Sequence, residues 1–350
     1  MSAATLIPTT KTSPLSPGSF GMAQESPQAV SASSDEIPAL VIGDLHGHLD
    51  RFEALLKQEG LLDRCEHCDG LGEVWEPCTL PGYQCEYSCE HDYYRECWNC
   101  DGQGWARTKK RAKVILVGDI GHFGMEKDPI TGAKSPGSAT ADLLTWRAAL
   151  NWADVILWGN HDRALVSDAH AFGGYIKPNS EVYDLIERAR WEGKLKLAHS
   201  THGFLITHAG LHLAFRDNKN VPDRVKKDPV EFAYWINAVE PQSYTGTPDQ
   251  LAVRDAIAIK RGGHAHAGGI LWRDIEEKLY PEFRQVFGHS ADHKYREVRY
   301  CNQWGYSRLE IPEYAGQSYC IDVGGPDKWP GAKCLAGIWL PEERIVRVDL

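Results

Sequence analysis

The sequence predicts an α/β fold, in which strands and helices alternate along the chain and pack in layers. Short apolar runs recur, each with a length typical of a buried strand. Segments with apolar residues at helical spacing lie between these runs. Most runs stop at a glycine followed by Asp, Asn or His, which indicates a strand that ends in a polar loop. We therefore expect functional loops to gather at the strand ends of a layered fold.

The pattern begins after a segment of different composition. Residues 1–36 are rich in Ser, Thr, Pro and Ala and have no apolar period, which favours a disordered tail. Residues 37–42 form the first expected strand, and the loop after it carries Asp44 and His46. Apolar residues at helical spacing then predict a helix over residues 49–62.

The same order of strand and polar loop recurs four more times. The expected strands and the polar residues after them are 113–117 with Asp119, 154–157 with Asn160 and His161, 204–206 with His208, and 286–287 with His289. Helices are expected at residues 140–152 and 181–191, and further strands that close a sheet at residues 319–322 and 345–348.

Composition excludes several classes of protein. The formal net charge of −10 argues against a high-affinity nucleic-acid surface, which needs clustered Lys and Arg. No apolar run approaches the roughly 18 residues of a membrane helix. The N-terminus lacks the charged start and apolar core of a secretory signal. We expect a cytoplasmic protein that needs neither a membrane nor a nucleic acid as its partner.

The polar residues at the strand ends are the types that bind divalent metals. Carboxylates, amide oxygens and imidazoles suit two metals that are bridged by one carboxylate, and such a pair can hold a phosphate and activate water. The motifs are, in chain order, Gly43-Asp44-Leu45-His46-Gly47, Gly118-Asp119, Gly159-Asn160-His161-Asp162, Thr207-His208-Ala209-Gly210 and Phe287-Gly288-His289-Ser290. This ordered set resembles the calcineurin-like metallophosphoesterase superfamily, nearest to its phosphoprotein-phosphatase branch and the related bacterial and phage enzymes.

The resemblance covers residues 39–60 and 112–350, and it implies a two-sheet β-sandwich flanked by helices. It also implies a role for each motif residue. Asp44 and His46 would bind one metal, Asp119 would bridge both, and Asn160, His208 and His289 would bind the second. The metals would be Mn²⁺, or Fe and Zn, and a hydroxide between them would attack phosphorus in line.

Two further roles concern the phosphate. By resemblance His161 would protonate the leaving oxygen as a general acid. Arg273, in the segment Ile270-Leu271-Trp272-Arg273, is the expected phosphate clamp, because a guanidinium can hold two oxygens at once. Arg261 is the second candidate for this clamp.

The second motif departs from the family pattern Gly-Asp-x-x-Asp-Arg-Gly. His122 and Phe123 stand where the family has the Asp that orients the general acid and the Arg that binds phosphate. Either the substrate differs, with Phe123 stacking on a ring, or Asp128 or Asp162 supplies the missing carboxylate, or activity is weakened. Because every direct ligand is present, loss of one supporting group should reduce the rate by about 10–100-fold rather than abolish it.

A cysteine-rich insert at residues 63–110 interrupts the pattern. Two stretches share the form C-x-x-C-x-G-x-G and begin at Cys65 and Cys97. Four thiolates suit a tetrahedral Zn²⁺ site. The stretches resemble the zinc-binding repeats of DnaJ-type chaperones, whose outer repeats pair with each other. This implies one structural zinc held by Cys65, Cys68, Cys97 and Cys100.

The insert has further metal-binding side chains. Cys78, Cys85, Cys89 and His91 could form a second zinc site, and His67 is an alternative ligand. A redox-active CxxC pair is the competing interpretation. The insert is too small to bury a core of its own, so zinc should fold it, and it could mediate contacts with a substrate or a protein partner.

The sequence therefore predicts a metal-dependent phosphoester hydrolase. Its parts would be the tail, a hydrolase domain at residues 37–62 and 111–350, and the zinc-ribbon-like insert at 63–110. Phosphomonoester hydrolysis on a phosphoprotein or a small phosphorylated molecule is the favoured activity. Hydrolysis of a dinucleoside polyphosphate is one alternative, and a catalytically weakened binding protein is another.

Overall fold

The computed structural model describes most of the chain from residue 37 onward. The described residues are 37–71, 73–76, 93–97, 99–100, 102–121, 125–127, 134–136, 139–166, 180–239, 246–257, 264–275, 277–289, 299–302, 305–307, 318–322 and 334–349. All of them belong to one compact unit, Glu36–Leu350. The tail expected at residues 1–36 lies outside the described residues.

The first sheet has six strands in the order β10-β9-β6-β1-β17-β18. They are β1 (Ala39–Ile42), β6 (Lys113–Leu116), β9 (Val155–Leu157), β10 (Leu195–Lys196), β17 (Cys334–Leu340) and β18 (Arg344–Asp349). β1 runs parallel to β6 and antiparallel to β17, and β6 runs parallel to β9. The polar loops after β1, β6 and β9 therefore leave the sheet at one edge.

The second sheet also has six strands, in the order β11-β12-β13-β16-β14-β15. They are β11 (Ala198–Thr201), β12 (Phe204–Thr207), β13 (Arg284–Phe287), β14 (Arg299–Asn302), β15 (Gly305–Ser307) and β16 (Ser318–Cys320). β12, β13 and β16 are parallel neighbours, so the residues that follow these strands also share one edge.

The two sheets face each other across a shared apolar core. Ala39 and Val41 of β1 belong to a buried cluster with Phe204 and Val286 of the second sheet. The alternate residues of β1 point to the opposite face, where Leu40 packs with the helices. This alternation is the period of two that a strand imposes on its side chains. The two-sheet β-sandwich flanked by helices, expected from the sequence, is confirmed.

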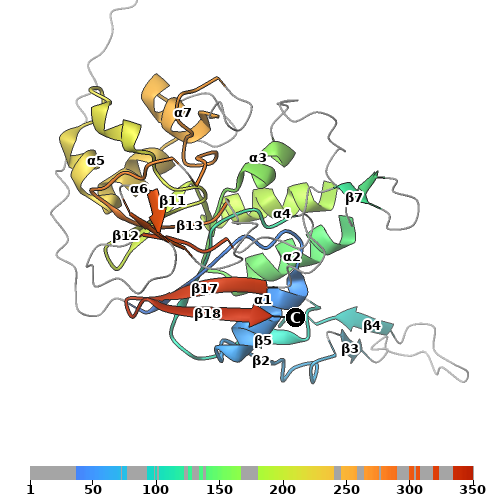
Figure 1. The fold of residues 1–350 in the computed structure, drawn as a ribbon. Helices are drawn as coiled ribbons and strands as arrows, with labels where there is room; N and C mark the ends of the chain where they lie inside the picture. The colour runs from blue at the N-terminus through green and yellow to red at the C-terminus, as the bar shows by residue number, and fades with distance from the viewer. Residues whose placement is uncertain are drawn as a thin grey trace, which may run out of the picture. The chain divides into compact units, whose positions relative to one another are not determined.

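Helices cover both outer faces of the sandwich (Figure 1). α1 (Leu49–Gln58), α2 (Ala139–Trp152) and α4 (Ser180–Trp191) pack on the first sheet. α6 (Pro229–Asn237) packs on β11 and β12, with α5 (Asp223–Lys227) and α7 (Pro248–Asp255) beside it. The short α3 (Asn160–Val166) begins directly after β9, and η1 (Leu213–Asp217) follows β12.

Helix α1 shows how local sequence builds this packing. Phe52, Leu55 and Leu56 are buried at helical spacing, and burying each contributes about 1.5–3 kcal/mol. The helix predicted over residues 49–62 is longer than the real one. It ends at Gln58, because Gly60 takes a φ of 66°, a conformation that stops the helix without strain in glycine.

The described residues also include three two-stranded sheets. β2 (Leu62–Arg64) pairs with β5 (Trp105–Arg107), β3 (Glu73–Glu76) with β4 (Tyr93–Glu96), and β7 (Met125–Lys127) with β8 (Lys134–Pro136). The β2–β5 ribbon joins the insert to the core between α1 and β6. Within the described part of the chain, no helix has both the length and the apolar character needed to cross a membrane.

Candidate metal centres

The strand-end loops of both sheets bring the six predicted ligands together. Asp44, His46 and Asp119 offer ligand atoms that all lie within 4.8 Å of one another. Asp119 forms a second group of the same kind with His208 and His289. Asp119 is thus common to both groups, as a bridging carboxylate must be.

Asn160 completes the second group. Its Oδ1 lies 2.8 Å from His208 Nε2 and 2.8 Å from His289 Nδ1. His208 is fully buried, and its other ring nitrogen, Nδ1, lies 2.9 Å from the backbone oxygen of Val117. Nδ1 must donate to that carbonyl, which leaves the Nε2 lone pair directed at the group. Burial lowers the pKa of His208 and so favours the neutral ligand form.

The first group contains a carboxylate oxygen that fits a metal. Asp44 is buried, and its Oδ2 accepts a hydrogen bond of 2.9 Å from the backbone N–H of His289. Its Oδ1 is buried and, within the described residues, accepts no hydrogen bond. Burial, reinforced by the carboxylates of Asp322 and Asp119, raises the pKa of Asp44 well above its usual range. A divalent cation would compensate both the orphaned oxygen and this charge repulsion.

Asp119 has the opposite electrostatic environment. Burial acts against its ionisation, but the charge that His208, His161 and His46 can carry outweighs it and lowers the pKa of Asp119. The bridging carboxylate is therefore held ionised among the imidazoles, which is the state that binds metal.

Three ligands hold strained backbone conformations. His46, Asp119 and His289 have φ values of 47°, 48° and 70°, a left-handed region that costs a residue other than glycine about 1–3 kcal/mol. Cross-loop hydrogen bonds hold this geometry, since the N–H of His46 donates to the oxygen of Asp119 at 2.8 Å. Strain of this kind at three predicted ligands supports a functional site.

Two glycines make room for the carboxylates. A Cβ on Gly288 would lie 2.0 Å from Asp44 Oδ1, and a Cβ on Gly159 would lie 2.0 Å from Asp119 Oδ1. Both distances are far below van der Waals contact. Gly159 therefore allows the loops after the neighbouring strands β9 and β6 to approach each other, and Gly288 allows the loop after β13 of the second sheet to approach the loop after β1 of the first.

His161 lies at the open side of the site. Its Nε2 is 3.9 Å from Asp119 Oδ2, and its side chain is 35% exposed, whereas that of His208 is 0% exposed. Its backbone N–H donates to Asp119 Oδ1 at 3.0 Å, and its ring meets the edge of the His46 ring. The predicted general acid thus stands beside the bridging carboxylate and remains accessible.

Asp162 joins two of the ligand loops. Its buried carboxylate accepts hydrogen bonds from the backbone N–H groups of Gly159 at 3.1 Å, Ile120 at 3.0 Å and Gly121 at 3.4 Å. It thereby ties the loop after β6, which carries Asp119, to the loop after β9. Burial and the nearby Asp119 raise the pKa of Asp162. His122, Phe123 and Asp128 lie outside the described residues.

The structure describes one of the two arginines that were predicted to bind the phosphate. Arg261 lies outside the described residues. Arg273 is buried and donates to the backbone oxygens of Ala209, Asp274 and Glu277.

One residue near the site was missed by the sequence analysis. Asp322 is 6% exposed and lies close enough to raise the pKa of Asp44 and to oppose the lowering at His208. It follows β16, but the sequence analysis assigned it to the strand itself. The signal was the same as at the other positions, an Asp directly after a short buried strand.

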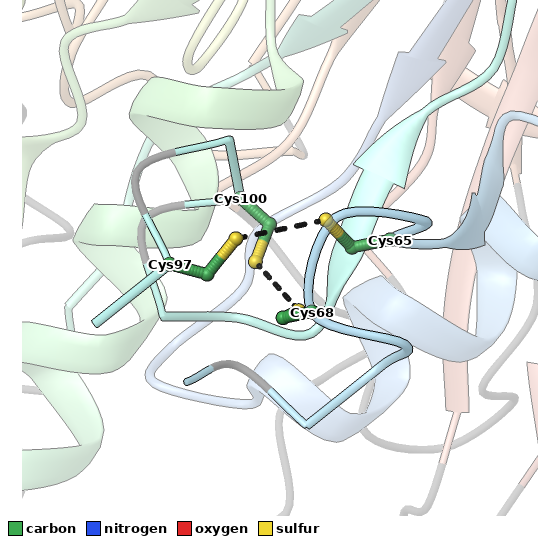
Figure 2. Close-up of side chains that lie close together, drawn as sticks. All are labelled: Cys65, Cys68, Cys97 and Cys100. Carbon is green, nitrogen blue, oxygen red and sulfur yellow. Dashed lines mark hydrogen bonds between the residues drawn. The ribbon is translucent and has the colours of Figure 1, made fainter. Parts of the chain in front are cut away.

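The four predicted zinc ligands form a separate cluster (Figure 2). Cys65 Sγ lies 3.8 Å from Cys97 Sγ, and Cys68 Sγ lies 3.6 Å from Cys100 Sγ. Sulfurs bound to one zinc at about 2.3 Å in a tetrahedron are about 3.8 Å apart. The paired stretches of the insert therefore place their sulfurs at the spacing that a single tetrahedral metal requires.

Local hydrogen bonds support thiolates in this cluster. The backbone N–H of Gly104 donates to Cys100 Sγ at 3.2 Å, and Asn99 Nδ2 donates to Cys65 Sγ at 3.3 Å. Burial opposes ionisation of Cys65, but hydrogen bonds from Asn99 and two backbone N–H groups lower its pKa to about 6. Burial raises the pKa of Cys100. Four sulfurs this close can all be thiolates only when a cation lies between them. Cys78, Cys85, Cys89 and His91 lie outside the described residues.

Comparison with known proteins gives matches in structure only. No protein-family model matches the chain, and no curated protein matches its sequence. Among solved structures it is similar to a candidate diadenosine tetraphosphatase, with 14% identity, a TM-score of 0.40, and coverage of 90% of this chain and 95% of that one. A metallophosphoesterase from Sphaerobacter thermophilus matches at 12% identity and a TM-score of 0.38, over 90% and 88% of the two chains. A cold-active protein-tyrosine phosphatase of a psychrophilic Shewanella matches at 12% identity and a TM-score of 0.43, over 90% and 78%.

Proposed function

We propose that this protein is a metal-dependent phosphoester hydrolase with a two-metal site at the strand ends. The observation that carries the proposal is the shared position of Asp119 in two groups of ligand atoms, each within 4.8 Å. Asp44 and His46 would complete the first metal site. Asn160, His208 and His289 would complete the second, and Mn²⁺, or Fe and Zn, suits this mixture of oxygen and imidazole ligands.

Two bound metals would polarise the phosphate oxygens and lower the pKa of a water held between them. The chain's own residues position the ligand groups and supply a proton. Asp119 holds both ligand groups at one point, and the buried His208 presents its Nε2 in one fixed tautomer. His161, half-buried at the open side, is placed to give a proton from Nε2 to the leaving oxygen.

The favoured substrate is a phosphomonoester, on a protein or a small molecule. An accessible His161 beside a mostly buried ligand set suits the transfer of one proton to an alkoxide or phenoxide leaving group. Hydrolysis of a phosphoanhydride, such as a dinucleoside polyphosphate, expels a phosphate anion. This leaving group is weakly basic, so it depends less on a proton from a general acid. The ratio of activities on the two classes of substrate therefore tests this assignment.

We also propose a structural Zn²⁺ at Cys65, Cys68, Cys97 and Cys100, in an insert that is distinct from the hydrolase domain. The sulfur spacings of 3.6 and 3.8 Å and the complete burial of the ligands support this, because structural zinc sites are closed. Leu71, which is 74% exposed beside this cluster, is the apolar side chain that a protein substrate or partner would cover.

The activity test compares wild-type protein with Asp119→Asn. With Mn²⁺ present, the wild-type protein should hydrolyse para-nitrophenyl phosphate, and the variant should lose at least about 100-fold in kcat/KM, because the bridging charge is gone. Asp184→Asn, at an exposed position on α4, is the matched control and should keep its activity. Metal content is measured on the same samples. A wild-type protein with both metals bound and no turnover of monoester, diester or anhydride would instead be a binding protein.

The zinc and the role of the insert are tested separately. Protein purified under reducing conditions and dialysed against a weak chelator should retain one equivalent of zinc by elemental analysis, or more if the rest of the insert binds a second ion. A zinc-free protein would refute the site. Leu71→Ser should raise KM for a phosphopeptide and leave KM for para-nitrophenyl phosphate unchanged, if the insert contacts a protein substrate.

A further inference from the structure

The guanidinium of Arg273 donates hydrogen bonds to backbone carbonyl oxygens next to the strand-end site. Arg273 is 1% exposed. Nε donates to the oxygen of Ala209 at 2.8 Å, and Nη1 donates to the oxygens of Asp274 at 2.9 Å and Glu277 at 2.5 Å. Glu277 also lies near enough for the positive charge of Arg273 to act on its pKa, so a carboxylate partly compensates the buried cation.

This bonding pattern conflicts with a phosphate clamp. A guanidinium holds two oxygens of one phosphate through a pair of nitrogens, either Nε with Nη2 or Nη1 with Nη2. Nε and Nη1 are both engaged with carbonyl oxygens, so each such pair contains an engaged nitrogen. Gripping a phosphate would therefore require breaking at least one buried hydrogen bond that the charged guanidinium makes to a backbone oxygen.

The carbonyl at Nε belongs to a ligand loop. Ala209 directly follows His208, and its N–H donates to the oxygen of Ile270 at 2.7 Å. Both backbone polar groups of Ala209 are therefore tied to the segment Ile270–Arg273. Gly210, with a φ of 82°, leaves the space that Arg273 occupies, because a Cβ there would lie 2.9 Å from Nε.

The same segment touches the other histidine loop. The guanidinium carbon of Arg273 lies 4.6 Å from the centre of the Phe287 ring, at the end of β13. The ring of Trp272 meets that of His289 edge to face, with centroids 5.8 Å apart. A single segment thus contacts the loops that carry His208 and His289, the two imidazoles of the second metal group.

We propose that Arg273 is a positioning residue for the second metal rather than a ligand for phosphate. It fixes the loop of His208 through Ala209 and the end of β13 through Phe287, and so sets the distance between the two imidazoles. This inference rests on the proposed function, since it assumes that the strand-end site binds two metals. It differs from the role that the family resemblance implies for this position.

The test measures metal binding and phosphate binding in one set of variants. Arg273→Met removes all donors, and Arg273→Lys retains the charge and a single donor group. Mn²⁺ binding is followed by calorimetry on metal-free protein, and orthophosphate binding by its inhibition constant at saturating Mn²⁺. Arg273→Met should bind one of the two Mn²⁺ ions about 10–100-fold more weakly, as expected when a group that orients a metal ligand is lost. Its kcat at low Mn²⁺ should fall, while the orthophosphate inhibition constant should change less than about twofold. Arg273→Lys should fall between it and the wild type.

Arg107→Met is the matched control for losing a partly buried guanidinium. Arg107 also donates to backbone oxygens, those of Trp152 and Ala112, but at the end of β6 remote from Asp119. It should lose thermal stability without losing Mn²⁺ affinity. If Arg273→Met does not fold, Arg273→Lys against wild type decides the question with the same two measurements.

The outcomes separate the two proposals. Unchanged Mn²⁺ affinity together with a tenfold higher orthophosphate inhibition constant would make Arg273 a phosphate clamp and overturn only the positioning role. Unchanged values of both would also overturn it. A wild-type protein that binds no Mn²⁺ would overturn the hydrolase proposal and this inference together.

Discussion

The strand-end site and the four-cysteine cluster differ in how far apart their residues lie in the sequence and in how exposed those residues are. The cysteine ligands lie within 36 residues of sequence, between Cys65 and Cys100, and are all buried. The predicted strand-end ligands span Asp44 to His289, come from loops of both sheets, and include His46, whose side chain is 19% exposed. A closed set of four thiolates suits a metal that only stabilises structure. An open set with a shared carboxylate, set in strained backbone, suits a metal that meets a substrate. The two sites should therefore respond differently to the same kind of change, whether a substitution, removal of metal or a change of pH.

The largest contrast is expected from adding one methyl group. Gly288→Ala would place a Cβ 2.0 Å from Asp44 Oδ1, so the loops must separate and the first metal group should open. We expect loss of at least about 100-fold in kcat/KM, with zinc content unchanged. Kinetics and elemental analysis of one preparation measure both. Gly193→Ala is the control: a Cβ there meets nothing within 4 Å, and the change should cost only the strain of its φ of 70°, about 1 kcal/mol.

Removing one thiolate should give the reverse result. Cys68→Ser should lose the zinc and lower the thermal midpoint by several degrees, because the metal contributes to folding of the ribbon. Activity at a temperature where the variant is folded should fall less than in Gly288→Ala. Zinc content, calorimetry and kinetics check this. Full loss of Mn²⁺ binding in this variant would show that the two sites are not independent.

Metal-free protein should show a pH effect confined to the strand-end site. The folded-state pKa of Asp44 is raised, so its contribution to stability is fully present at pH values below the ordinary aspartate pKa of about 4 and is lost as the pH rises through the raised value. Asp44→Asn carries no such charge, so its melting temperature relative to wild type should increase as the pH rises from about 4. Scanning calorimetry with and without Mn²⁺ measures this. A difference that stays constant with pH would contradict it.

The smallest effect is expected at an ion pair between the insert and α2. Arg147 Nη1 lies 3.3 Å from Glu96 Oε1, and the Glu96 side chain is 63% exposed. Such exposed pairs contribute about 0–1 kcal/mol. Arg147→Gln should therefore change neither zinc content nor activity, and should shift the midpoint of urea unfolding only slightly. A large shift would mean that this contact, rather than the β2–β5 ribbon, holds the insert to the core.

The convergence of the six predicted ligand residues could be predicted because each follows a short buried strand and a tight turn, and such residues meet at sheet edges. The fold class could be predicted because strand-like and helix-like segments alternate along the sequence. β17 was not predicted, although it pairs with β1, because its apolar run Cys334–Leu340 is not followed by the glycine and Asp, Asn or His that marked the other buried strands. Asp322 was missed because the end of a strand cannot be placed to within two residues from sequence alone.

The surroundings of the ligands could not be predicted from sequence. Asp162 was considered as a partner for His161, yet its carboxylate accepts three backbone hydrogen bonds across two loops. Arg273 was predicted to bind the phosphate, and the structure adds that its Nε donates to the carbonyl of Ala209, next to His208. Both outcomes depend on how loops distant in sequence meet, which no local pattern contains.

The pairing of β1 sets an order of assembly. All ligands of the zinc and of the first metal group lie before residue 120, so the ribosome releases them early. Yet β1 is completed by β17, and the N–H of Gly43, just before Asp44, donates to the oxygen of Ala336. The loop that carries Asp44 is thus anchored by a strand that is synthesised long after it. If both sites bind metal as proposed, a nascent chain could acquire zinc at the cysteine cluster early, whereas the strand-end site should bind its metals only after β17 has been made and has paired with β1.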